Sequence, residues 1–170
     1  MNWTHLHLAL NHVPVLGVPL LTLLLGWGWL FRSRDIQRVA LLWLAVLSGV
    51  AIAIKFTGDN AAGVDPQRFV PVKAFLEQHE QSADQATTAV FVLGLAAASG
   101  VFLGRGTRPV PKWILGGVVG LGVVAAVLFG RTANLGGQIL HPSIRPHSTL
   151  NLDADFGDPQ VAQRRRGHDL

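Results

Sequence analysis

Four long runs with almost no charged residue restrict most strongly what this chain can fold into. They lie at about 13–31, 39–56, 86–103 and 113–130. Each run is close to the roughly 20 residues that a helix needs to cross the hydrocarbon core of a bilayer. A backbone in lipid must satisfy its own hydrogen bonds, so apolar runs of this length form helices. The sequence therefore predicts an all-α protein, an integral membrane four-helix bundle over residues 1–141, followed by an extended polar C-terminal tail at 142–170.

The composition supports this class and excludes several functions. Charged residues make up 14% of the chain, against about 25% in soluble domains, and the mean hydropathy is +0.37. The absence of cysteine excludes disulfides, thiolate-bound metals and iron–sulfur clusters. The sequence contains no phosphate-binding loop, zinc-protease motif or nucleophile elbow. An enzymatic role is therefore limited to an electron-transfer subunit of an oxidoreductase, and no nucleic acid is expected as a partner.

The charges outside the apolar runs predict the orientation in the membrane. The two short loops hold one acid, Asp35, and six basic residues: Arg32, Arg34, Arg38, Arg105, Arg108 and Lys112. The long connection at 57–85 holds five acidic and two basic residues. Short loops rich in arginine and lysine stay in the cytoplasm. We therefore expect a multi-pass protein of the bacterial inner membrane, with both termini and the long connection on the outer, periplasmic side.

Glycine and proline predict several local features of the helices. Pro14 and Pro19 should loosen the first helix or delay its start. Gly58 is a natural stop for the second helix. Residues 72–84 should form a helix that continues into the third span. After the fourth span, we expect the glycine pair within 134–137 to turn the chain back over the bundle.

Histidines gather on the predicted outer side of the membrane. They are His5, His7, His12, His79, His141 and His147. His12 opens the first span, His79 precedes the third, and His141 follows the fourth. In a compact bundle these helix ends are neighbours, so the three imidazoles can converge near the outer leaflet. Neutral imidazole is a common ligand of haem and metals, and helical bundles hold such groups between facing helices.

Each candidate residue also has a plainer interpretation. His12 could bond a carbonyl freed near Pro14, and His79 and His141 could be solvated surface residues. Lys55 and Arg131 could anchor helix ends at the interface, or pair with haem propionates. On helical spacing, the face of His79 continues as small residues that would either pack tightly against a neighbouring helix or border a macrocycle: Ala83, Ala86, Val90, Gly94 and Ala97.

Short motifs at three helix ends resemble a known family. The chain shows His7-x4-His12-x-Pro14 at its first span, a lone His79 before its third, and Leu-Gly-Gly-Gln-Ile-Leu-His at 135–141. These are similar to a large group of small four-helix bacterial membrane proteins, most known only as membrane domains and some suspected to be b-type cytochromes. The resemblance covers about residues 1–141. It implies that the functional histidines are His7, His12, His79 and His141.

Together these observations predict a b-type haem protein that transfers electrons between the quinone pool and a periplasmic redox partner. Two of His12, His79 and His141 would be axial ligands, and the protein would be a subunit of a larger respiratory or redox complex. Quinone is a second expected cofactor, and membrane lipid surrounds the bundle. One alternative is a copper, zinc or iron site built from those histidines and Glu80. Another is a cofactor-free structural or assembly subunit whose glycine-rich faces dock partner helices.

Overall fold

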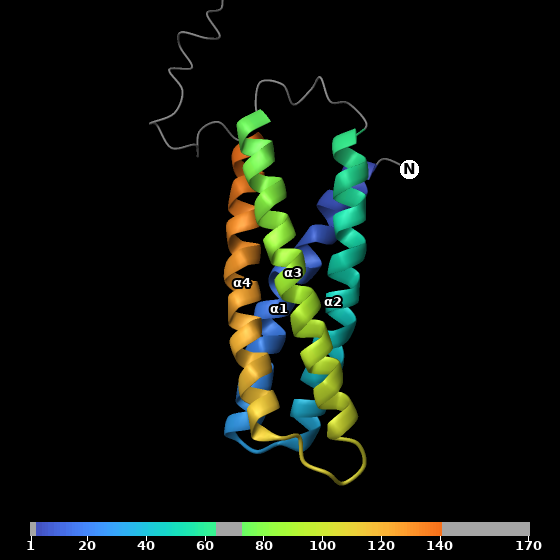
Figure 1. The fold of residues 1–170 in the computed structure, drawn as a ribbon, viewed down its shortest axis with the longest axis vertical. Coiled ribbons are helices and arrows are strands. Elements are labelled where there is room, and N and C mark those ends of the chain that lie inside the picture. The colour runs from blue at the N-terminus through green and yellow to red at the C-terminus, as the bar shows by residue number, and fades with distance from the viewer. Residues whose placement is uncertain (1–2, 64–72, 141–170) are drawn as a thin grey trace, which may run out of the picture.

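The computed structural model describes residues 3–63 and 73–140, and the side chains of residues 10–58 and 73–139. Within these ranges every regular element is a helix, and the helices form an up-and-down bundle (Figure 1). The helices are α1 (Trp3–Leu30), α2 (Arg34–Gly63), α3 (Lys73–Leu103) and α4 (Lys112–Leu140). All four are long and apolar enough to cross a membrane. The predicted all-α fold with four membrane-spanning candidates is therefore confirmed.

The helices are longer than the apolar runs that predicted them. They contain 28, 30, 31 and 29 residues, which corresponds to about 42–47 Å at 1.5 Å per residue. A bilayer with its headgroup regions is about 40–45 Å thick. Most of the additional residues of α2, α3 and α4 lie at the end away from the short loops, at 57–63, 73–85 and 131–140. As predicted, the helix at 72–84 and the third span form one continuous element, α3.

Two local predictions from glycine were wrong, and so was the late start of the first helix, one of the two effects expected of its prolines. The second helix does not stop at Gly58 but continues to Gly63. The glycine pair at 136–137 lies inside α4 and makes no turn. Burial of Leu135 and Gln138 on either side of the pair favours the helical path. The first helix begins at Trp3 and includes both of its prolines, because glycine and proline are tolerated in long apolar helices.

Each helix packs mainly against two neighbours in a closed ring. α1 contacts α2 and α4, and α3 contacts the same two helices, so α1 and α3 are diagonal in the bundle. In Figure 1 the short α1–α2 and α3–α4 connections lie at the same end. We call this the basic end, because it carries the six loop cations. The opposite end, which carries His12 and His79, is called the histidine end.

Two contacts between a glycine and a hydroxyl residue bring neighbouring helices close together. Gly94 of α3 faces Ser48 of α2, and a Cβ added to Gly94 would lie 2.6 Å from the Ser48 Cβ. Gly122 of α4 faces Thr22 of α1 in the same way. Both hydroxyls are buried and donate to the carbonyl four residues earlier at 2.7 Å. Small residues at such contacts allow close backbone approach, which drives helix association in lipid.

The outer surface of the bundle is apolar. Large side chains such as Leu23, Leu95 and Val127 are 71%, 56% and 67% exposed. Only 28–39% of the residues in the most apolar stretch of each helix are buried inside the bundle. A surface of this kind in water would be a contiguous apolar patch far larger than those of soluble monomers. The composition of the exposed surface therefore agrees with a multi-pass membrane protein.

At the basic end, arginines of α2 hold the α3–α4 connection. Arg38 donates to the carbonyl of Gly104 at 2.9 Å and also to the carbonyl of Gly106. Arg34 donates to the carbonyl of Thr107 at 3.2 Å. Because a guanidinium makes strong charge-assisted bonds to carbonyl oxygens, these contacts join the first helical hairpin to the second.

We expect Gly94→Val to destabilise the bundle by about 1–3 kcal/mol, because the new side chain must displace Ser48 from a close-packed contact. Thermal unfolding in detergent, followed by circular dichroism, measures this change. Gly117→Val is the matched control, since Gly117 is exposed and an added Cβ meets nothing within 4 Å. Equal destabilisation by both substitutions would show that helix propensity, not close approach, determines the effect.

Candidate functional site

His79 is the predicted ligand whose surroundings are best defined. It lies partly buried on α3, with its Nδ1 3.0 Å from the backbone carbonyl oxygen of Thr132 on α4. A carbonyl oxygen only accepts hydrogen bonds, so Nδ1 carries the proton and donates. In the neutral ring, Nε2 then carries the lone pair that a metal ion uses. Metal-ligating histidines generally donate their other ring N–H to a carbonyl or carboxylate in this way.

Residues of two helices fix the position of the His79 ring. Ser82, one turn after His79, is 1% exposed, and its hydroxyl lies 2.9 Å from the hydroxyl of Thr132. The Thr132 hydroxyl donates to the Leu128 carbonyl, so Ser82 is the donor between the two. A Cβ added to Gly136 would lie 3.1 Å from Cε1 of His79. His79, Ser82, Thr132 and Gly136 are called the His79 seat below.

His12 lies on a different side of the bundle. It is exposed on α1, which is diagonal to α3. Next to it, Oδ1 of Asn11 is buried and has no hydrogen-bond partner within the described part of the chain. An unsatisfied buried acceptor costs about 1–3 kcal/mol. His7 belongs to α1, but its side chain lies outside the described residues, as does all of His141.

The stripe of small residues below His79 is used for helix packing. Ala86, Val90 and Ala97 are at most 1% exposed, and Gly94 contacts Ser48. Of the two interpretations offered by the sequence, tight packing against a neighbour therefore describes 86–97. Because this stripe at 86–97 is packed against neighbouring helices, a haem macrocycle beside His79 would have to lie between residue 86 and the ends of the helices.

The two cations expected near haem propionates differ in their surroundings. Nζ of Lys55 lies 2.9 Å from Oδ1 of Asp84 and thereby links α2 to α3. Both side chains are substantially exposed (35% and 62%), so solvent screens the pair and it adds little stability. Arg131 is exposed on α4, one residue before the seat residue Thr132. To bind a haem propionate, Lys55 would have to leave Asp84. Arg131 is exposed and lies next to Thr132, so a propionate near the His79 seat could reach it.

The alternative metal site is not assembled by the described side chains. Within them, no group of three or more His, Cys, Asp or Glu residues could hold a metal ion. Glu80 is exposed on α3, and the alternative also needs His141, which lies outside the described residues. A non-haem site at the histidine end therefore stays a prediction.

Sequence reasoning found His79 but missed the residues that orient it. Ser82 follows His79 by three positions, so helical spacing already placed both on one face. Thr132 had no such signal, because the register of α4 against α3 depends on packing, and Gly136 was interpreted as part of a turn. Thr132 also acts through its backbone carbonyl, which every residue type possesses.

Comparisons of the chain with protein-family models, with curated proteins and with solved structures found no match. The resemblance to small four-helix bacterial membrane proteins accordingly stays a prediction from the sequence.

Proposed function

We propose that the protein is a b-type haem protein of the bacterial inner membrane. It transfers electrons between the quinone pool and a periplasmic redox partner, as a subunit of a larger complex. The observation that carries this proposal is the orientation of His79, whose Nδ1 donates to the Thr132 carbonyl. That contact fixes the tautomer in which Nε2 can coordinate iron, and raises the basicity of the ligand.

The chain offers two candidates for the second axial ligand. His141 is the first residue after α4 and follows the seat residue Gly136 by five positions. His12 lies at the same end of the bundle, on α1, the helix diagonal to α3. Haem would supply the one-electron redox change, His79 would hold the iron, and Arg131 would provide a cation for a propionate.

The buried Oδ1 of Asn11 supports a quinol site near His12. The atom is an acceptor that lacks a donor within the described residues, and a quinol hydroxyl is a donor of the required kind. Oxidation of quinol also releases protons, and imidazole is the side chain best suited to accept them near neutral pH. Asn11 would bind the hydroxyl and His12 would accept its proton.

The charge distribution supports an inside-facing basic end. Six cations and one carboxylate lie in or beside the two short connections, which share one end of the bundle (Figure 1). The positive-inside rule assigns this end to the cytoplasm. The His79 seat then faces the periplasm, where a soluble electron carrier could approach.

A cofactor-free structural subunit is the second candidate, and one feature of α4 favours it. Gly117 and Gly120 are exposed, and a Cβ added to either meets nothing within 4 Å. An open pair of glycines on a lipid-facing helix is suited to docking a partner helix. Failure to find haem or metal in a folded sample would select this function.

The first experiment is an absorption spectrum of the detergent-purified protein, oxidised and then reduced with dithionite, with metal analysis on the same sample. We expect a sharp reduced α-band typical of bis-histidine haem b. His79→Ala should abolish the band because it removes the ligand, whereas the adjacent Gln78→Ala, at an exposed position of α3, should retain it. Stoichiometric copper, zinc or iron without haem would instead support the metal site.

Substitution of Gly136 tests the His79 seat without removing any ligand. We expect Gly136→Leu to displace the His79 ring, since even a Cβ there would lie 3.1 Å from Cε1. The reduced spectrum should then lose intensity or change from a low-spin to a high-spin form. Gly130→Leu is the control on the same helix, because Gly130 is exposed and open. If both variants keep the parental spectrum, the contact with Gly136 does not position the haem ligand.

Single cysteines can test the orientation, because the chain has none of its own. Ala74 and Thr107 are both exposed and lie at opposite ends of the bundle. In right-side-out membrane vesicles, we expect a membrane-impermeant maleimide to label Ala74→Cys at once and Thr107→Cys only after lysis. The reverse pattern would place the histidine end in the cytoplasm and exclude a periplasmic electron partner.

A further inference from the structure

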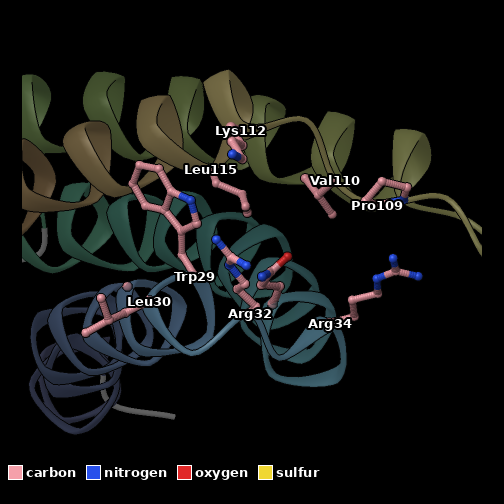
Figure 2. Close-up of a pocket in the computed structure, with 10 residues that line it drawn as sticks. Trp29, Leu30, Arg32, Arg34, Pro109, Val110, Lys112 and Leu115 are labelled. Atoms are coloured by element: carbon pink, nitrogen blue, oxygen red, sulfur yellow. The ribbon is translucent and has the colours of Figure 1, made fainter.

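A groove at the basic end brings three cations together beside apolar walls. It has a volume of about 880 Å³ and lies between the end of α1 and the start of α4. Figure 2 shows Arg32 and Lys112 on opposite sides of it, with Arg34 further out near Pro109. No carboxylate lines the groove among the residues that form it. The groove is therefore suited to an anion.

The backbone holds Arg32 in the groove at an energetic cost. Its φ is 56°, and it has the only positive φ of any described residue other than glycine. The N–H of Arg32 donates to the Trp29 carbonyl at 3.2 Å, and that of Ser33 to the Gly28 carbonyl at 2.9 Å. This pair of bonds is a Schellman motif, whose left-handed position glycine usually occupies. An arginine there is strained, which points to a role for its cation.

Apolar side chains form the walls beside these cations. Trp29 packs across the gap between α1 and α4, because its ring would lie 3.3 Å from a Cβ added to Gly116. Leu30 is 75% exposed and lies where the groove meets the outer surface of the bundle. Leu115 is buried and lines the inner side of the groove. A ligand in this position meets cations at one end and apolar surface at the other.

We propose that the groove binds the headgroup of an anionic phospholipid. Arg32 and Lys112 would hold the phosphate, Arg34 would add positive charge further out, and an acyl chain would lie along Leu30. Charge complementarity identifies this occupant, since basic pockets between membrane helices on the cytoplasmic side accept anionic headgroups. Trp29 lies at the end of α1. Tryptophan is typical of the membrane–water interface, where the phosphates of lipid headgroups lie. The inference rests on the membrane placement proposed above and not on the haem.

The test is thermal unfolding of the full-length protein in detergent, titrated with short-chain phosphatidylglycerol or phosphatidylcholine. We expect phosphatidylglycerol alone to raise Tm in a saturable way. The double variant Arg32→Gln/Lys112→Gln should bind it about twenty-five-fold more weakly, at about fivefold per cation. Arg105→Gln/Arg108→Gln is the matched control: it removes the same charge at the same end, from side chains outside the groove.

Arg32→Gly separates lipid binding from folding. Glycine relieves the strain at φ 56°, so the variant should unfold at the same or a higher temperature without lipid. It should nevertheless lose most of its response to phosphatidylglycerol. A variant that unfolds earlier but responds normally to the lipid would overturn the role given to Arg32.

Three further outcomes would contradict the proposal. An equal effect of the two double variants would mean that diffuse charge, not the groove, attracts the lipid. An equal response to phosphatidylcholine would exclude selection for an anionic headgroup. An equal response to inorganic phosphate alone would identify a site for a free anion. The haem spectrum is measured on the same samples, so loss of the electron-transfer proposal with a retained lipid response leaves this inference intact.

Discussion

The bundle depends on the close approach of helix backbones at positions without bulky side chains. In lipid, apolar side chains gain little by leaving their surroundings, so helix association relies on van der Waals contact and interhelical hydrogen bonds. The pairs Gly94–Ser48 and Gly122–Thr22 provide such contacts on two sides of the ring of helices. Both hydroxyls are satisfied within their own helices. They therefore pack as small residues without leaving a polar group unpaired.

The sequence predicted the helical class and the number of spans because both follow from the length of uncharged runs. Helix ends were predicted less well. Gly58 and the glycine pair at 136–137 were expected to end helices, yet α2 and α4 continue through them. A glycine ends a helix only where the chain can adopt a left-handed conformation with its carbonyls satisfied. At the end of α1 that conformation is adopted by Arg32 instead.

The candidate site was predicted in part. Hydropathy and spacing brought His12 and His79 to one end of the molecule, which needed only the up-and-down topology. The contact between His79 and the Thr132 carbonyl depends on how far α4 is shifted along α3, and nothing in the sequence fixes that shift. The loop arginines were interpreted only through the positive-inside rule. Their convergence with Lys112 in one groove required the folded connections.

The contacts of Arg34 and Arg38 with the α3–α4 connection have a consequence for biogenesis. Both arginines belong to the first hairpin, whereas their carbonyl partners at Gly104, Gly106 and Thr107 belong to the second. During synthesis the first hairpin is completed long before those carbonyls exist. Until then, Arg34 and Arg38 lack the backbone partners that they bind in the folded bundle. The hydrogen bonds between the two hairpins can therefore form only after the second hairpin has been synthesised and has packed against the first.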